Sequence, residues 1–193
     1  MMRIPIYFVA DLAGSLALEW YAFPRALYRS EAQPLQFSHK VHTGDKGGMK
    51  CEDCHTIQAD GSFTGIPELE KCAGCHSAQI GSSKEEKALV ENYVTPNRAL
   101  PWHIYSRQPD NAYFSHAFHV NLAKIACSEC HRDQGKTDQL RPYVENRISG
   151  YSRDIWGASI ARISTGRAGM KMTDCEHCHD QRGVKTGCLD CHK

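Results

Sequence analysis

The sequence has few apolar residues and almost no net charge, and both shortages restrict what the protein can be. Hydrophobic residues, cysteine included, make up 41% of its 193 residues, and the mean hydropathy is −0.51. Such a polypeptide can build only a modest core of its own. The 23 basic and 22 acidic residues leave a formal charge of +1. The strongly basic balance of nucleic-acid-binding proteins is therefore absent.

No cysteine is left over from one repeated motif, C-x-x-C-H. The five copies are Cys51-Cys54-His55, Cys72-Cys75-His76, Cys127-Cys130-His131, Cys175-Cys178-His179 and Cys188-Cys191-His192. This motif is the attachment signature of c-type haem, in which two thiols bind the porphyrin and the histidine binds the iron. Zinc sites and thiol redox pairs also use C-x-x-C, but neither requires histidine at that position five times. The sequence predicts five covalent haem c groups.

Five haems in so short a chain would supply much of the interior themselves. We therefore expect a mainly α fold with extensive loops, in which short helices wrap stacked haems and there is little or no sheet. The apoprotein should be unfolded, as in other domains that fold around a bound group. Each ferric haem with two ionised propionates adds about −1, so the oxidised protein should carry a net charge of about −4. This charge favours basic partners and argues against nucleic acid.

Residues 4–24 are mostly apolar, and a bilayer requires about 20 such residues. Arg3 precedes the run, Arg25 and Arg29 follow it, and aromatic residues mark its far end. We expect a signal-anchor transmembrane helix within residues 1–30, with the N-terminus in the cytoplasm. The haem domain, residues 31–193, would then face the periplasm. A cleaved signal peptide is the alternative, although a clear small-x-small cleavage site is missing.

Asp11 lies near the middle of this apolar segment, where a carboxyl group is costly unless it faces protein. Small residues lie close to it, namely Ala10, Ala13, Gly14 and Ala17. Such a small-residue face lets helices approach closely in a membrane. The pattern predicts a helix packed on another membrane subunit. The alternative is a lone anchor with a protonated Asp11.

A second motif, Phe-Ser-His-x-x-His, occurs at 37–42 and again at 114–119, each time shortly before a C-x-x-C-H. The haem repeats thus cover 37–76 and 114–131, and two further haem motifs lie in 175–192. Histidines three residues apart in a helix point to roughly the same side. The sequence therefore predicts His39, His42, His116 and His119 as distal iron ligands, with a surface position as the alternative for some of them.

Five irons would need one more distal ligand, and four residues are candidates: His103, His177, Met170 and Met172. His177 lies inside its own attachment loop and is poorly placed. Met172 lies three residues before Cys175, and a thioether ligand would raise the potential of that haem. Met172 is the preferred candidate and His103 the alternative. A five-coordinate fifth haem also stays open.

The segment 132–174, between the third and fourth haem motifs, is the longest stretch without a predicted histidine ligand and is rich in arginine and lysine. Residues 152–163 can form an amphipathic helix, with Ser152 as its N-cap and Ile155, Trp156, Ile160 and Ile163 on one side. This segment would either cover a haem or dock on another subunit.

Three stretches carry a family resemblance: FSHKVH before its C-x-x-C-H, TGIPELEKCAGCH at 64–76, and PDNAYFSHAFHV before CSECH. They resemble the multihaem cytochrome of alternative complex III, and still more the corresponding subunit of the quinone reductase complex of sulfate-reducing bacteria. The resemblance implies a class III, c3/c7-like multihaem domain on a membrane anchor. It also implies iron–sulfur, molybdoenzyme-like and polytopic quinone-binding partner subunits. Met172 matches a methionine of the alternative complex III pattern, whereas Ser106 replaces a histidine of that pattern.

The resemblance implies an electron-transfer subunit in the cytoplasmic membrane rather than an enzyme. Electrons would pass from a soluble tetrahaem cytochrome c3 through the haems toward menaquinone. In alternative complex III the flow is reversed, from quinol outward. A quinol dehydrogenase of the NapC/NrfH type fits the paired Phe-Ser-His-x-x-His repeats less well. A nitrite or hydroxylamine reductase would need an open haem, whereas this chain has histidine ligands to spare and lacks a C-x-x-C-K motif.

Overall fold

The structure, a computed structural model, describes residues 5–62, 64–104, 111–148, 170 and 172–192. It divides into two compact units. The first unit holds the described residues up to Glu31 and those from Pro142 to Ile148, and the second holds the other described residues. The helix expected at 152–163 lies outside the described residues.

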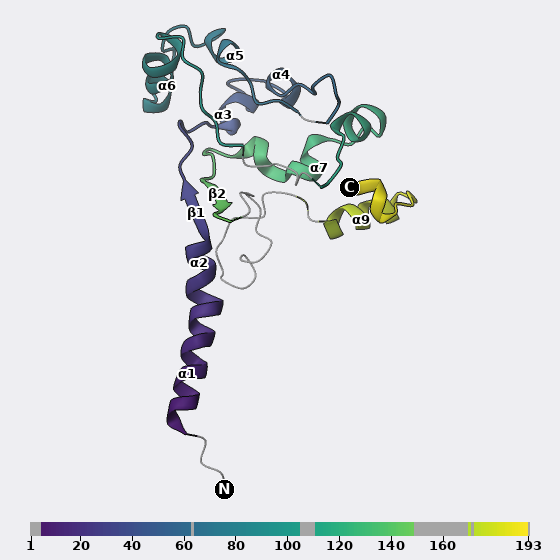
Figure 1. Cartoon of the computed structure of the whole chain (residues 1–193). Helices are drawn as coiled ribbons and strands as arrows, with labels where there is room; N and C mark the ends of the chain where they lie inside the picture. Colours follow the sequence, from purple (N-terminus) through teal and green to yellow (C-terminus); the bar gives the residue numbers. More distant parts are fainter. Residues whose placement is uncertain (1–4, 63, 105–110, 149–169, 171, 193) are drawn as a thin grey trace. The chain divides into compact units, whose positions relative to one another are not determined.

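The first unit begins with three helical segments that follow one another without a break: α1 (Ile6–Ala17), the π-helical η1 (Leu18–Ala22) and α2 (Phe23–Leu27) (Figure 1). Strand β1 (Tyr28–Glu31) continues the chain and pairs antiparallel with β2 (Tyr143–Asn146). No single helix in the described ranges combines the length and apolar character needed to cross a bilayer.

An ion pair reinforces the β1–β2 pairing at the register that places Arg29 opposite Glu145. The Arg29 guanidinium also lies 3.0 Å from Glu31, and the Tyr143 hydroxyl donates to Glu145 at 2.8 Å. The Arg29–Glu145 pair forms only when the two strands are aligned in this register, so it favours that alignment. The ladder therefore ties the end of the N-terminal helical run to a segment more than a hundred residues later.

The second unit consists of short helices joined by long loops (Figure 1). The helices are α3 (His39–Thr43), α4 (Cys51–Cys54), α5 (Leu69–Ala73), α6 (Lys84–Leu89), η2 (Val90–Val94), η3 (Ala117–Leu122), α7 (Cys127–His131), η4 (Arg132–Lys136), α9 (Met172–Gln181) and α10 (Cys188–Cys191). Helices this short are marginal in water by themselves. They need a partner surface to pack against.

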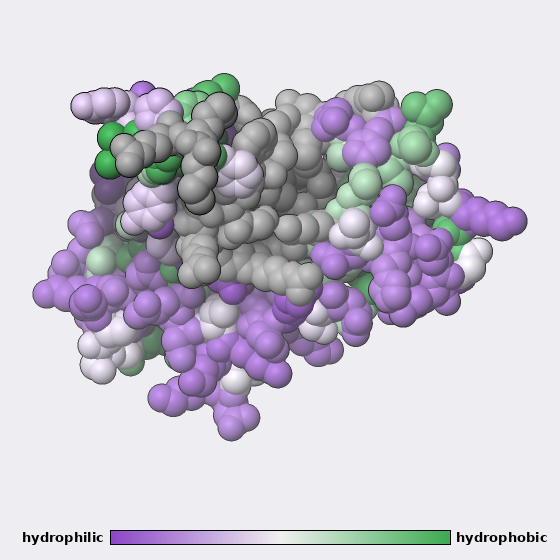
Figure 2. Space-filling model, turned by 90° about the horizontal axis from the view of Figure 1, so that it is seen from below, coloured by the Kyte–Doolittle hydropathy of each residue, from purple (hydrophilic) through white to green (hydrophobic). Residues whose placement is uncertain are grey.

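The polypeptide supplies very little of that surface. Among the described residues, only Tyr28, Leu69 and Leu89 are buried apolar side chains, and none is less than 2% exposed. The face shown in Figure 2 is dominated by hydrophilic residues outside the grey region. The mainly helical, loop-rich fold expected from the sequence is confirmed, and the described sheet is limited to two short strands.

Candidate haem-binding site

The first cysteine of each C-x-x-C-H motif lies on a helix, and at three motifs the same hydrogen bond closes the turn that follows. The histidine N–H donates to the carbonyl of the first cysteine at 2.8 Å for His55, 2.9 Å for His76 and 2.9 Å for His192. Residues four apart lie on one helix face. The turn therefore presents the first thiol and the imidazole to the same side. None of the ten cysteines forms a disulfide.

The two Phe-Ser-His-x-x-His segments share one local structure. The serine hydroxyl accepts from the backbone N–H three residues later, at 3.2 Å in the Ser38 segment and 3.3 Å in the Ser115 segment. This bond caps the first helical turn. The phenylalanine then packs on both imidazoles of its own segment. The repeat of serine and phenylalanine is visible in the sequence, but their roles as cap and ring partner were not predicted from it.

The phenylalanine geometry is nearly identical in the two copies. Phe37 stacks on His42 with ring centroids 4.2 Å apart and meets His39 edge-on at 4.9 Å. Phe114 stacks on His119 at 4.6 Å, and it meets the other histidine of its segment edge-on at 4.8 Å. Each phenylalanine therefore fixes the orientation of two predicted iron ligands.

Backbone carbonyls fix which nitrogen of these imidazoles carries the proton. His42 and His119 donate from Nδ1 to the carbonyls of Ser38 and Ser115, both at 2.8 Å. Nδ1 of His55 donates to Gly65 at 2.8 Å. His116 does the same to Ser62 at 2.7 Å. A carbonyl can only accept, so Nδ1 is protonated and Nε2 keeps a lone pair for a metal.

The structure brings the predicted distal and proximal histidines together in pairs. Ring centroids are 6.1 Å apart for His42 and His76, 6.4 Å for His116 and His131, and 6.1 Å for His119 and His179. Two imidazoles on opposite sides of one metal have centroids about 6 Å apart, for a metal–nitrogen bond of about 2.0 Å. All three pairs match that separation.

His39 lies within electrostatic range of the first motif. Burial lowers the pKa of His39, and His55 is the next largest cause, ahead of His42. Coulomb effects fall with distance, so His55 is a close neighbour of His39. The four histidines of the two Phe-Ser-His-x-x-His segments thus lie near four different C-x-x-C-H motifs.

Thiols of different motifs are also neighbours. Burial raises the pKa of Cys51, Cys72 and Cys130, and in each case a thiol of another motif adds to the effect. The added thiol is Cys127 for Cys51 and Cys54 for Cys72, while Cys175 and Cys178 act on Cys130. Four attachment motifs therefore form one contiguous series in which the first motif lies between the second and the third.

The fifth motif has a different environment. Nδ1 of His192 lies 3.3 Å from the Asn111 carbonyl, and Tyr113 N–H donates to the Cys191 carbonyl at 2.7 Å. In the described part of the chain, no second histidine ring is paired with His192. The C-terminal motif thus contacts the segment that directly precedes the second Phe-Ser-His-x-x-His motif.

The structure does not single out one of the candidates for the fifth distal ligand. Met172 begins α9 and is 60% exposed. Gln33 bonds the backbone of His103 at both its N–H and its carbonyl, at 3.0 and 2.9 Å. The His177 ring bonds Gln181 at 2.9 Å. The fifth distal ligand stays a prediction.

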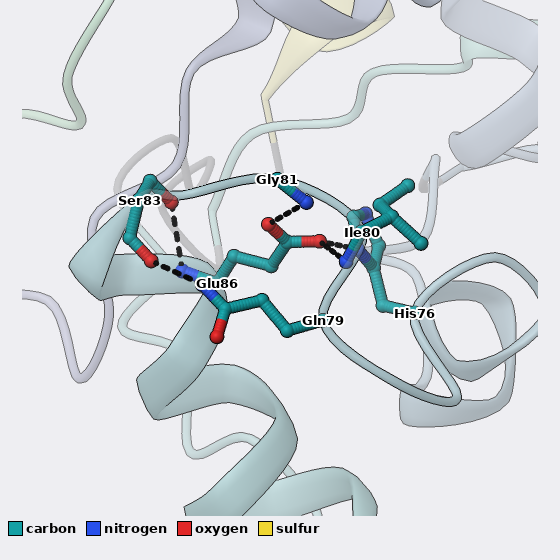
Figure 3. Close-up of polar contacts among 6 residues, drawn as sticks. All are labelled: His76, Gln79, Ile80, Gly81, Ser83 and Glu86. Atoms are coloured by element: carbon teal, nitrogen blue, oxygen red, sulfur yellow. Dashed lines mark hydrogen bonds and ion pairs between the residues drawn. The ribbon is translucent and has the colours of Figure 1, made fainter.

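The His76 imidazole bonds a side chain that sequence reasoning did not single out. Nδ1 of His76 lies 2.8 Å from Oε1 of Glu86, which also accepts from Ile80 N–H at 2.9 Å, while Oε2 accepts from Gly81 N–H at 2.8 Å (Figure 3). Hydrogen bonds hold the pKa of the Glu86 carboxyl below its usual value. The bond from Ile80 has the largest effect, and those from His76 and Gly81 add to it. Ser83 caps the helix α6 that carries Glu86.

These residues fit c-type haem. The cysteines form no disulfide, the histidine pairs have the spacing of two axial ligands, and the described polypeptide buries few apolar side chains of its own. A porphyrin held by each C-x-x-C-H would provide the missing apolar surface.

Comparisons with known proteins agree. Residues 22–99 match the class III cytochrome c family. Over 201 aligned residues the chain is 38% identical to the multihaem cytochrome c subunit of menaquinone reductase from Nitratidesulfovibrio vulgaris strain Hildenborough. The alignment covers 96% of this chain and 89% of that protein. The comparison confirms the resemblance seen in the sequence.

Proposed function

Because the chain belongs to the family of multihaem cytochrome c subunits of menaquinone reductase, we propose that it is the electron-transfer subunit of a membrane-bound, quinone-linked respiratory complex. The observation that carries the proposal is the set of histidine pairs at about 6 Å, each joining a Phe-Ser-His-x-x-His histidine to a C-x-x-C-H histidine. Three such sites, together with a first motif that lies within electrostatic range of His39, suit a chain that relays electrons.

The residues of each site have separate roles. The two cysteines would attach the haem, the C-x-x-C-H histidine would supply the proximal nitrogen and the second histidine the distal one. When bound, the haem would supply one-electron redox chemistry at its iron. With His39, His42, His116 and His119 as distal ligands, four irons have no coordination position open to a substrate. The subunit would carry electrons and catalyse no reaction itself. For the fifth haem we keep Met172 as the proposed distal ligand and His103 as the alternative.

We place the electron donor in the periplasm, as a soluble tetrahaem cytochrome c3, and menaquinone as the final acceptor. An oxidised holoprotein with a net charge of about −4 would attract a donor that has a basic haem edge. Electron flow in the opposite direction, from quinol outward as in alternative complex III, is the main competing function. A quinol dehydrogenase of the NapC/NrfH type is the second competing function.

We further propose that the N-terminal helical run anchors the protein in the cytoplasmic membrane by a single pass. Three consecutive helical segments, α1, η1 and α2, together cover Ile6–Leu27. This is about 30 Å of helix, close to the thickness of a bilayer core. Every side chain of α1 is exposed, and nothing lies within 4 Å of a Cβ built on Gly14. An open face around Asp11 suits contact with a polytopic quinone-binding subunit beside the iron–sulfur, molybdoenzyme-like subunits.

Exchange of Asp11 for leucine tests membership of such a complex. Asp11→Leu should leave the cytochrome in the membrane fraction, because the segment becomes more apolar. It should reduce the amounts of the other subunits that co-purify with it in mild detergent. Val9→Leu, two residues earlier and therefore on roughly the opposite side of the same helix, is the matched control and should leave co-purification unchanged. Unchanged co-purification of Asp11→Leu would contradict the proposed helix contact, and purification of the wild-type cytochrome alone would contradict the complex.

A further inference from the structure

We propose that Glu86 tunes the haem held by His42 and His76, and that its carboxylate keeps this haem at a lower reduction potential than a neutral partner would. The proposal rests on the ligation by His42 and His76 proposed above. Glu86 would act as a positioning residue through His76, without touching the iron.

The contact between Glu86 and His76 is largely shielded from solvent and held by further hydrogen bonds. Side-chain exposure is 19% for His76 and 11% for Glu86. Backbone N–H groups of Ile80 and Gly81 bind the two carboxylate oxygens, so the carboxylate is fixed from two sides (Figure 3). Ser83 Oγ accepts from the backbone N–H of Glu86 at 3.0 Å and starts α6 in the register that aims this side chain at His76.

The Nδ1 atom of His76 bonds a carboxylate, whereas the Nδ1 atoms of four other histidines bond backbone carbonyls. His42, His55, His116 and His119 each donate to a backbone carbonyl. A bond to a carboxylate is charge-assisted and roughly twice as strong as a neutral one. It moves electron density onto the imidazole and raises its basicity as a ligand. A more basic ligand, next to a fixed negative charge, stabilises ferric iron over ferrous iron, and the potential falls.

The test is a redox titration, followed by electron paramagnetic resonance, of the holoprotein in its purified complex. Glu86→Gln should increase the equilibrium constant for reduction of one haem about tenfold, which is about 59 mV for one electron. Glu85→Gln is the matched control. It removes the same charge from the adjacent residue, whose side chain is 35% exposed and lies 3.7 Å from Lys84. Its effect should be less than twofold.

The spectrum also identifies which haem responds. The ring planes of His42 and His76 differ by 62°, whereas those of the pairs at His131 and His179 differ by 7° and 18°. The signal of a low-spin ferric haem depends on this angle, so the first pair should be separable from the other two. His42→Met, which changes an axial ligand directly, should alter the same signal that Glu86→Gln shifts.

Glu86→Asp keeps the charge and should shift the potential less than Glu86→Gln does. A purely structural role for Glu86 predicts the reverse order, because the shorter carboxylate disturbs the Ile80 and Gly81 bonds at least as much. Equal shifts in Glu86→Gln and Glu85→Gln, or that reverse order, would overturn the proposal. If His42→Met alters no signal, the ligation itself fails. If His42→Met alters a haem signal that Glu86→Gln does not shift, the ligation stands and only the proposed role of Glu86 is wrong.

Discussion

The denatured chain should carry the mass of five haems, and replacement of Cys72 and Cys75 by alanine should remove one of them. All ten cysteines lie in C-x-x-C-H motifs and none forms a disulfide. Thioether bonds survive denaturation, so each intact motif keeps its haem when the fold is lost. Intact-mass spectrometry of the denatured protein measures the number directly.

Ala73→Ser, inside the same motif, leaves both thiols in place and should retain five haems. Four haems in the wild-type chain, or five in the double cysteine variant, would contradict the attachment scheme. Loss of more than one haem from the double variant is also informative. It would show that the second motif, whose Cys72 lies beside Cys54 of the first, must hold its haem before neighbouring haems attach.

His42→Met should raise the potential of one haem by on the order of 100 mV, a part of the range of about 0.8 V that axial ligands span. A methionine thioether donates less electron density than an imidazole, so it favours ferrous iron. The other four haems should move little. The measurement is a redox titration of the visible haem bands.

His177→Met is the matched control, because the exposed His177 ring bonds Gln181 and lies with none of the paired histidines. Its titration should match the wild type. Met172→His in the same series should lower one potential if Met172 is the fifth distal ligand. No response to Met172→His would move the assignment to His103 or leave that haem five-coordinate, and no response to His42→Met would contradict the pairing with His76.

The sequence predicts the candidate haem-binding residues that belong to short local motifs. A C-x-x-C-H or Phe-Ser-His-x-x-His segment closes within one helical turn, so its ligands follow from spacing alone. Which distal histidine meets which motif depends on long-range folding. His119, for example, reaches His179 across sixty residues of chain.

Glu86 is a residue whose contact with His76 could not be predicted from the sequence. It is one of 22 acidic residues and lies in no motif. Its role depends on a loop that returns the first turn of α6 to the His76 imidazole ten residues earlier. The pairing of β1 with β2 is similar, because only the fold brings Arg29 to Glu145. Contacts between distant, ordinary residues leave no signal in one sequence.

Stopped-flow reduction of the purified complex tests the central claim most directly. Reduced tetrahaem cytochrome c3 is mixed with the complex, and a menaquinone analogue is the final acceptor. Our account predicts rapid haem reduction at low ionic strength that slows as salt rises, because charges are screened over about 10 Å at 0.1 M. Quinone reduction should follow. Slow, salt-independent haem reduction would contradict the donor assignment. Rapid haem reduction by menaquinol, with no net quinone reduction by the cytochrome, would contradict the proposed direction of flow.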